Sequence, residues 1–585
     1  MSKKEMQLNG TMLQGFSWNL PSDGQHWRRL GQMASGFVEK GITSVWLPPA
    51  YKGTQGQNDV GYGVYDLWDL GEFDQRGSVP TKYGTRRELN SAVVAMHEAG
   101  IDVLGDVVLN HRLGADATEQ VKARPVAADN RLYDLGDLET IEAWTAFTFP
   151  GRNGEYDDFT WDWHCFKGTD YNQATGSNGI WLFDGKGWDS DVSQEMGNFD
   201  YLMGADVDFN NPDVYEQLVK WGVWFVDEVG LDGLRLDAIK HMSRDFYRRW
   251  LKDVRAKVDH ELFVVGEYWA FTSGELCNYA GDQPVMNLFD VPLHFAFYRA
   301  SVDREHIDFS HILDEAYVSV DPVHAVTFVD NHDTQPNQSL ASTVEHWFKP
   351  VAYSIILLRE AGYPCVFFAD LYGLPNDAIP AVAELPLLME IRKRYSYGAQ
   401  HDYLDESDLA GWTREGDADM DESGLAVVLC NRAFPEEQPP EPVDQPEQPQ
   451  DEQGEGGASA DAGDGESQDV TQDNGDASTD AIAVEQDSTS EQAGVAEGDG
   501  DTDPEPVAEP EPSDPGLPDG WPAKEMYVGS QHAGETWRCV LGNHREVLID
   551  DEGVGRFPAS KASMTAVYLP AGAADRLNRI PIVMD

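Results

Sequence analysis

Four short apolar segments, each ending in reactive polar side chains, constrain the fold of this chain more than any other feature. They are residues 101–111, 231–241, 261–269 and 324–333. Apolar residues fall on both faces of residues 231–237, which is typical of strands in parallel sheets that are covered by helices. Polar residues at the carboxyl ends of parallel strands meet on one face of a β/α barrel, where active sites lie. The pattern predicts such a barrel with a reactive site at that face.

Arg235 and Asp237 give the clearest chemical signal. They are two residues apart in an expected strand, so both side chains leave the same face. An adjacent guanidinium favours the charged carboxylate, so we expect a lowered pKa for Asp237, which suits a nucleophile. A purely structural ion pair at a strand end is the alternative, and the other three segments argue against it.

The sequence contains eight expected strands, which is the number in a parallel β/α (TIM) barrel of the α/β class. Helix-like segments alternate with the expected strands, and we assign residues 1–111 and 206–398 to the barrel. The expected strands are residues 11–18, 42–48, 101–111, 231–237, 261–269, 284–290, 324–330 and 365–369.

Separated motifs resemble those of the α-amylase family of retaining glycoside hydrolases. They are DVVLNH (106–111), GLRLDAIKH (233–241), GEYW (266–269) and FVDNHD (328–333), in the family's order. The loop at residues 58–73 is similar to that of the bacterial liquefying and cytoplasmic branch. The resemblance implies endo-hydrolysis of α-1,4-glucosidic bonds in starch, glycogen or maltodextrins, with retention of configuration through a covalent glycosyl-enzyme.

The resemblance also assigns roles by position. Asp237 is the expected nucleophile, Glu267 the general acid and then base, and Asp333 the stabiliser of the transition state. The expected substrate-binding residues are Tyr62, His111, Arg235 and His332 at the cleavage point, Lys240 and His241 on the leaving side, and Trp269. Tyr62 is expected to stack on the sugar that is cleaved.

Residues 112–205 lack the barrel rhythm and predict an irregular inserted domain after the third strand. Their aspartates alone are weak signals, because surface charge explains them equally well. The resemblance implies a calcium site that ties this domain to the barrel, with ligands from Asn110, Asp189, Asp200, Asp206 and the backbone carbonyl of His241. Lys167 stands where liquefying relatives have an aspartate that helps to hold further metal ions. We therefore expect one calcium ion.

Residues 399–434 and 521–585 predict a C-terminal all-β domain. Residues 435–520 interrupt it with 86 residues that include no aromatic side chain. Such a segment buries too little apolar surface to order itself, so we expect a disordered acidic insertion. We expect the flanking segments, 426–431 and 526–529, to pair as strands across it.

The chain carries 103 acidic and 42 basic residues, a net charge of −61. Residues 435–520 hold 27 of the acids, which leaves 76 acids for 42 bases, a net charge of −34, in the remainder. This charge argues against nucleic-acid and anionic-membrane partners, so an α-glucan is the partner we expect, with the chain a monomer. The low lysine content, 16 against 26 arginines, resembles proteins of salt-accumulating archaea and predicts a halophilic protein.

The cysteine pattern and the amino end predict a cytoplasmic address. Five scattered cysteines without a CxxC spacing argue against a disulfide framework and a zinc site. No apolar window is long enough for a membrane span or a secretory signal.

Two alternative functions remain open at this level. A maltooligosaccharide-forming amylase or a transglycosylase could use the same scaffold, because sugar as well as water can take up a glycosyl-enzyme. A non-catalytic glucan- or partner-binding protein is the second alternative, although all three carboxylates are present.

Overall fold

The computed structural model describes residues 9–374, 379–435 and 520–577, and all of these except Pro435 belong to one compact unit. The expectation of disorder in residues 435–520 concerns residues 436–519, which lie outside the described ranges.

Eight parallel strands close into a barrel in the order β1-β16-β15-β14-β13-β12-β5-β2. The strands are β1 Met12–Gln14, β2 Ser44–Trp46, β5 Asp102–Val107, β12 Gly233–Leu236, β13 Phe263–Gly266, β14 Asn287–Phe289, β15 Ala325–Phe328 and β16 Tyr363–Phe367. Seven lie inside the expected segments and β16 overlaps the eighth, so the predicted barrel is confirmed.

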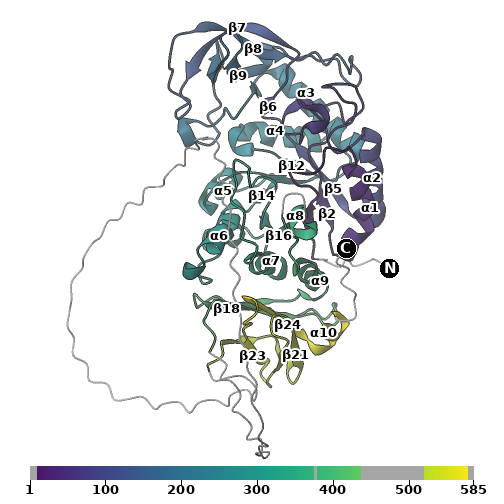
Figure 1. The fold of residues 1–585 in the computed structure, drawn as a ribbon, viewed down its shortest axis with the longest axis vertical. Coiled ribbons are helices and arrows are strands. Elements are labelled where there is room, and N and C mark those ends of the chain that lie inside the picture. The colour runs from purple at the N-terminus through teal and green to yellow at the C-terminus, as the bar shows by residue number, and fades with distance from the viewer. Residues whose placement is uncertain (1–8, 375–378, 436–519, 578–585) are drawn as a thin grey trace, which may run out of the picture. The chain divides into compact units, whose positions relative to one another are not determined.

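Helices surround this barrel on its outside (Figure 1). They are α1 His26–Glu39, α2 Arg86–Ala99, α3 Pro212–Val229, α4 Arg244–Arg255, α5 Ser273–Ala280, α6 Val291–Val302, α7 Lys349–Leu358, α8 Phe368–Tyr372 and α9 Leu385–Tyr395. Helix α2 begins with a capping box between Thr85 and Glu88 and ends at Gly100, whose φ of 81° closes the last turn.

Gly105 lets α3 approach the third barrel strand closely. A Cβ atom there would lie 2.5 Å from Leu231 Cδ1 and 2.8 Å from Phe225 Cε1. Because these neighbours are buried core side chains, no larger residue fits without moving the helix.

The inserted segment after β5 is more regular than its sequence predicts. It forms a six-stranded antiparallel sheet in the order β6-β11-β9-β10-β7-β8. Its strands are β6 His111–Arg112, β7 Ala117–Val126, β8 Glu139–Ala146, β9 Phe166–Asn172, β10 Ser177–Phe183 and β11 Ala205–Val207. The irregular composition reflects the loops between the strands, whereas cross-strand pairing supplies the order that the composition does not reveal.

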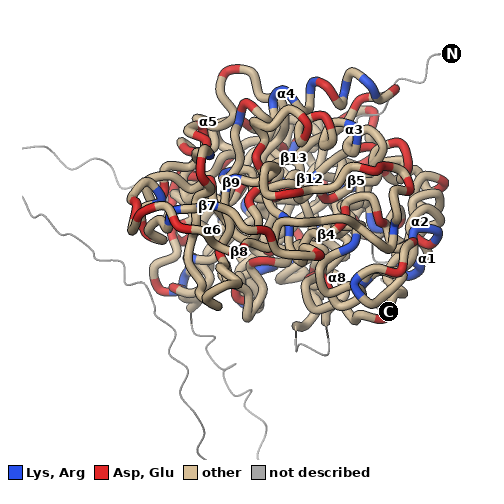
Figure 2. The backbone as a smooth tube through the Cα atoms, turned by 90° about the horizontal axis from the view of Figure 1, so that it is seen from above, with Lys and Arg blue, Asp and Glu red and all other residues tan. Residues whose placement is uncertain are grey.

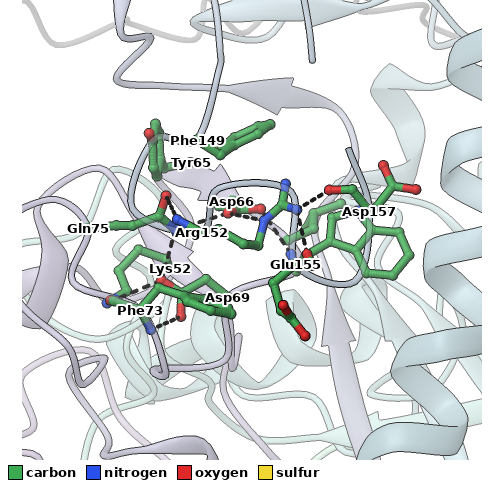
Figure 3. A network of polar contacts seen from close by, with 12 residues as sticks. Lys52, Tyr65, Asp66, Asp69, Phe73, Gln75, Phe149, Arg152, Glu155 and Asp157 are labelled. Atoms are coloured by element: carbon green, nitrogen blue, oxygen red, sulfur yellow. Dashed lines mark hydrogen bonds and ion pairs between the residues drawn. The ribbon is translucent and has the colours of Figure 1, made fainter. Parts of the chain in front are cut away.

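A buried polar network fixes the inserted segment to the hairpin of β3 Lys52–Gly53 and β4 Val64–Asp66 (Figure 3). Arg152 Nε lies 2.8 Å from Asp66 Oδ2, with both side chains buried. Gln75 Nε2 donates to Asp66 Oδ2 and to Asp69 Oδ2, both at 3.0 Å. Lys52 Nζ lies 3.4 Å from Asp69 Oδ2. Since the charges are buried and paired, this network favours a single geometry of the junction.

The C-terminal part is rich in strands, as predicted. A six-stranded sheet has the order β17-β18-β19-β24-β21-β22, and β20 pairs with β23 in a second, smaller sheet. The strands are β17 Gln400–Tyr403, β18 Leu409–Arg414, β19 Leu425–Cys430, β20 Ala523–Tyr527, β21 Thr536–Leu541, β22 Glu546–Leu548, β23 Val554–Pro558 and β24 Thr565–Pro570.

Two details of this part differ from the prediction. A helix, α10 Ala571–Leu577, follows the last strand, so the domain is not purely β. The expected pairing across residues 435–520 is also wrong, because β19 pairs with β18 and β24 while β20 pairs with β23. The partner of a strand depends on which faces must be buried, which is a property of the whole sheet.

Acidic residues are spread along the helices and loops of the backbone, and basic residues are interspersed among them (Figure 2). None of the helices in the described ranges has the length and apolarity that crossing a bilayer requires.

Candidate active site

The reactive segments of the sequence end together at one rim of the barrel. Strand β12 lies between β5 and β13. Backbone pairing continues beyond the strands, since Asp237 N donates to Val107 O (3.0 Å) and Glu267 N donates to Leu236 O (2.9 Å). Asp237 and Glu267 therefore leave neighbouring strand ends, and Asp333 follows β15 at the same rim.

Arg235 is the centre of this group of carboxylates. Its side chain is completely buried, with Nη1 2.8 Å from Asp237 Oδ1 and Nη2 2.6 Å from Glu267 Oε2. Nη1 also lies 3.0 Å and 3.1 Å from the two oxygens of Asp106. A planar guanidinium with fixed donor directions holds these carboxylates in defined orientations.

Asp106 is a residue of this site that the sequence analysis missed. Its buried carboxylate accepts hydrogen bonds from Trp46 Nε1 (3.0 Å) and Tyr62 OH (2.9 Å), besides those from Arg235. The signal was present, because Asp106 is a carboxylate inside the otherwise apolar segment 103–109. A charge in such a segment needs buried partners.

Burial raises the pKa of Asp237 well above its usual range. The Arg235 guanidinium opposes this shift, whereas the charges of Glu267, Asp106 and Asp333 add to it. The predicted lowering of the Asp237 pKa is therefore wrong, because one guanidinium does not offset desolvation and three neighbouring carboxylates. Burial likewise raises the pKa of Asp333 to about 7. Burial beside other carboxylates makes both of these groups easier to protonate than free carboxyl groups.

Three flat rings lie parallel beside the carboxylates. The Tyr62 ring stacks on the His332 ring, with centroids 5.0 Å apart and planes 12° apart. Trp18 lies nearly parallel to Tyr62 at 5.8 Å. Tyr62 and Trp18 are only partly buried, so this group offers apolar ring surface near the reactive carboxylates. The sequence analysis missed Trp18, although it ends the first expected strand.

His332 is neutral in this environment. Burial, together with the charge of Arg235, lowers its pKa well below the usual value. Gln14 Nε2 lies 2.9 Å from Nδ1 and donates to it, which leaves the proton on Nε2. Nε2 lies 3.4 Å from Asp333 Oδ2 but makes no hydrogen bond in the described structure.

The segment after Asp237 turns sharply. Ala238 adopts φ 48° and ψ 37°, a left-handed conformation that is unusual for a residue with a side chain. Its N–H donates to Glu267 Oε2 at 3.2 Å. The turn leads to Lys240, whose Nζ donates to both Glu195 oxygens (2.9 and 3.1 Å) and to the Trp269 carbonyl (3.1 Å). No sequence signal marked Glu195.

The remaining expected residues lie close to this group. His111 Nε2 donates to the Tyr62 carbonyl (2.9 Å), and His241 Nδ1 donates to the Phe199 carbonyl (2.9 Å). Trp269 is 8% exposed and its ring packs edge-on against Phe295, so little of the residue is open to a ligand.

The expected calcium ligands include several buried polar atoms without a hydrogen-bond partner in the described structure. They are Asn110 Oδ1 and Nδ2, Asp200 Oδ1 and Asp206 Oδ2. The three side chains are each 1% exposed. Buried oxygens left in this way need a partner, and an oxygen-rich set fits a calcium ion. Burial raises the pKa of Asp206, the charge of Lys167 opposes the shift, and neighbouring carboxylates add to it.

Lys167 lies among the same carboxylates. Its Nζ is 2.8 Å from Asp189 Oδ2, 2.6 Å from Asp200 Oδ2 and 3.9 Å from Asp206 Oδ2. Across the described ranges, no three His, Cys, Asp or Glu side chains are arranged as a ready-made metal site. The expected calcium ligands also include the Asn110 amide and a backbone carbonyl, and the Lys167 ammonium already contacts the aspartates among them. A cation would therefore bind through the buried oxygens that have no hydrogen-bond partner.

Comparison with known proteins agrees with this geometry. The family model "Alpha amylase, catalytic domain" matches residues 37–384. The chain is 43% identical to an "Alpha-amylase" of Bacillus licheniformis over 564 residues, which covers 95% of this chain and 93% of that protein. It is 49% identical to a "Glucan 1,4-alpha-maltohexaosidase" of Bacillus sp. (strain 707), covering 73% of this chain and 83% of that protein.

Two further similarities extend the comparison. The chain is 42% identical to a "Cytoplasmic alpha-amylase" of Escherichia coli (strain K12), covering 72% of this chain and 88% of that protein. A solved alpha-amylase of Geobacillus thermoleovorans complexed with acarbose shares the fold, with a TM-score of 0.53 at 14% identity, and covers 96% of this chain and 97% of that one. With its closed barrel and the carboxylates at one rim, the chain belongs to the α-amylase catalytic-domain family of glycoside hydrolases.

Proposed function

We propose that this protein hydrolyses internal α-1,4-glucosidic bonds of starch, glycogen or maltodextrins with retention of configuration. The observation that carries the proposal is the arrangement of Asp237 and Glu267 on neighbouring strand ends, both held by Arg235. Retaining hydrolysis needs two carboxyl groups beside the scissile bond, one as nucleophile and one as acid and then base.

In the first step, Glu267 gives its proton to the departing glycosidic oxygen while Asp237 bonds to the anomeric carbon. The bond between that carbon and the departing oxygen breaks with its electron pair on the oxygen. In the second step, Glu267 takes a proton from water, the oxygen of that water bonds to the anomeric carbon, and Asp237 leaves as a carboxylate. Asp333 stabilises the positive charge that develops on the sugar, and His332 holds the sugar at the cleavage point or orients the carboxylates.

Substrate contacts follow from the ring group and the turn after β12. We propose that Tyr62 offers its partly exposed ring to the apolar face of the cleaved sugar, with His111 and Arg235 orienting the hydroxyls and the carboxylates. Lys240 and His241 take the leaving side. We propose that Trp269 acts there through its carbonyl, which accepts from Lys240, because its ring is mostly buried.

We propose one calcium ion held by Asn110, Asp189, Asp200, Asp206 and the carbonyl of His241. When bound, the ion supplies charge neutralisation and cross-linking of the inserted domain to the barrel, with no part in bond cleavage. The buried oxygens without partners support this proposal. A lower melting temperature after chelation at low salt tests it, and an unchanged midpoint contradicts it.

A maltooligosaccharide-forming specificity is the second candidate, favoured by the similarity to a maltohexaose-forming enzyme. Transglycosylation on the same scaffold belongs to the same alternative. A non-catalytic glucan- or partner-binding role is disfavoured, because the carboxylates and their buried Arg235 are all present.

We further propose a cytoplasmic, monomeric protein adapted to high salt. All five cysteines lie in the described ranges and are free thiols, which is usual in reducing compartments. The name of the Escherichia coli relative agrees with that address.

A time course of soluble starch digestion, with products resolved by size, tests the activity. Endo-hydrolysis predicts a rapid fall in polymer length before small sugars accumulate, and proton NMR of early products should show the α-anomer first. A product of one size from the first time point would favour the maltooligosaccharide-forming alternative. Initial β-anomers would contradict retention.

A further inference from the structure

We propose that Gln335 is a positioning residue for substrate binding, because its side-chain amide fixes the end of the first barrel strand and so holds the Trp18 ring beside Tyr62 as a second sugar-stacking surface. This inference rests on the glucan hydrolysis proposed above, and it adds a residue that acts through Trp18 on binding rather than on bond cleavage.

Trp18 lies beyond the paired part of β1. The ladder of this strand ends at Gln14, which pairs with Trp46 of β2 and with Phe367 of β16. Gly15 N donates one further backbone bond, to Trp46 O at 2.8 Å. Trp18 is three residues past Gly15, so the barrel ladder does not fix the position of its ring.

The Gln335 amide supplies an anchor for this segment. Its Oε1 accepts from Ser17 Oγ at 2.9 Å and from Trp18 N at 3.1 Å. Gln335 is 1% exposed and Ser17 is fully buried, so water does not compete for these bonds. Gln335 follows β15, and β16 lies between β15 and β1 in the barrel. The amide therefore joins the Trp18 segment to the loop that carries Asp333, past an intervening strand.

The loop that carries Gln335 is itself fixed. Thr334 Oγ1 donates to Asp330 Oδ1 at 2.8 Å, and the N–H groups of Asp333 and Thr334 donate to Asn331 Oδ1 at 2.9 and 3.0 Å. Gln335 Nε2 is buried and has no hydrogen-bond partner in the described structure. The accepting oxygen is therefore the part of the Gln335 amide that holds the Trp18 segment.

The ring geometry shows what this anchor maintains. The Trp18 ring is parallel to Tyr62 within 2° and to His332 within 10°, with centroid distances of 5.8 and 6.0 Å. Because the Tyr62 and His332 centroids are 5.0 Å apart, the three centroids form a triangle and no ring is sandwiched between the other two. Trp18 is only half-buried, so it offers apolar ring surface to a second sugar. Such a sugar does not react, so the contact strengthens binding equally in the ground state and the transition state.

The test is a double-mutant cycle on maltoheptaose hydrolysis. Gln335→Met keeps the side-chain length and removes the acceptor, so KM should rise roughly 3- to 10-fold while kcat stays within about twofold of the wild type. Trp18→Ala should also raise KM. Adding Gln335→Met to Trp18→Ala should raise KM no further, because the amide acts through the ring.

Gln531→Met is the matched control. The Gln531 amide also bonds to the backbone, at 2.7 Å from the Glu415 carbonyl, but it lies in the C-terminal part. This variant should leave both kinetic constants unchanged. An unchanged KM in Gln335→Met, or a further rise of KM in the double variant, overturns the proposal. A fall in kcat at unchanged KM shows that Gln335 acts on the Asp333 loop instead, and it overturns the proposal as well.

Ser17→Ala covers the case in which Gln335→Met does not fold. It removes one of the two donors and leaves Gln335 Oε1 bonded to Trp18 N, so no buried group loses its only partner. KM should rise roughly twofold in an otherwise wild-type chain and should not change in the Trp18→Ala background. An unchanged KM in the first case, or a rise in the second, contradicts the proposed role.

A binding measurement separates this inference from the proposed activity. Isothermal titration calorimetry of maltoheptaose with Glu267→Gln, alone and combined with Gln335→Met, compares affinity without turnover. The Kd should rise by the same factor as KM. If the wild type does not hydrolyse starch but this rise of Kd is found, the proposed activity fails and the role of Gln335 stands. Equal Kd values in the two variants overturn that role whatever the activity.

Discussion

Asp106→Asn tests whether the carboxylate that the sequence analysis missed positions the reactive groups. Asp106 accepts from Trp46, Tyr62 and Arg235 while fully buried. Loss of the acceptor's charge weakens each of these three interactions by about 1 kcal/mol, a gross loss of about 3 kcal/mol. Relief of repulsion from Asp237 and its neighbours offsets part of this. We expect the free energy of unfolding to fall by about 1–3 kcal/mol.

The kinetic effect is more specific. Because Asp106 orients Arg235 and Tyr62 without touching the scissile bond, kcat/KM should fall roughly 10- to 100-fold, equivalent to about 1.4–2.7 kcal/mol. The charge of Asp106 also helps to raise the pKa values of Asp237 and Asp333. Without it, these carboxyl groups ionise at lower pH, so the acidic limb of the kcat/KM profile should move to lower pH.

The assay is starch hydrolysis across pH, together with thermal melting. Asp102→Asn is the control, because Asp102 begins the same strand, β5, but is exposed there. It should leave the profile and the melting temperature unchanged. A wild-type profile and midpoint for Asp106→Asn would refute the positioning role.

Four further predictions follow from other parts of the molecule. Asp237→Asn and Glu267→Gln should each lower activity by several orders of magnitude with melting at or above that of the wild type; near-normal hydrolysis by either variant contradicts the proposed roles. The melting temperature should rise toward molar salt as carboxylate repulsion is screened, and full stability in salt-free buffer argues against a halophilic protein. Burial lowers the pKa of His26 from 6.5 to about 4, so the stability from its neutral form is present above pH 6.5 and is lost as pH falls toward 4. Between pH 7 and 5, the free energy of unfolding of His26→Gln should fall by about 2 kcal/mol less than that of the wild type, and an equal fall in both proteins contradicts this. Replacing residues 435–520 by a turn of about six residues should stabilise the fold by about 2 kcal/mol if the segment closes as a free chain, with unchanged turnover; a large loss of turnover in a folded variant shows that the segment reaches the substrate.

The last of these substitutions is feasible because the two ends of the segment meet. The rings of Phe434 and Trp521 lie with their centroids 4.8 Å apart. A short turn can therefore join the flanking strands, although β19 and β20 belong to different sheets.

The sequence alone determined the barrel and the position of its reactive rim. Local apolar runs specify strands, and the residue that ends each run must lie at the strand end, so Asp237, Glu267 and Asp333 could be placed before any coordinates. The motifs around these residues were enough to indicate the family. Burial was equally predictable for β12, because apolar residues fall on both faces of residues 231–237.

The tertiary structure decided the properties that depend on long-range neighbours. Burial raised the pKa of Asp237, where the adjacent Arg235 had suggested the opposite direction. The partners of Asp106 lie 44, 60 and 129 positions away in the sequence, so no local pattern showed what compensates its charge. The pairing of β20 with β23, and the contacts of Lys167 with distant aspartates, depended in the same way on which surfaces the folded chain brings together. Desolvation and strand partnership are properties of the assembled fold, whereas strand and helix signals are properties of a few consecutive residues.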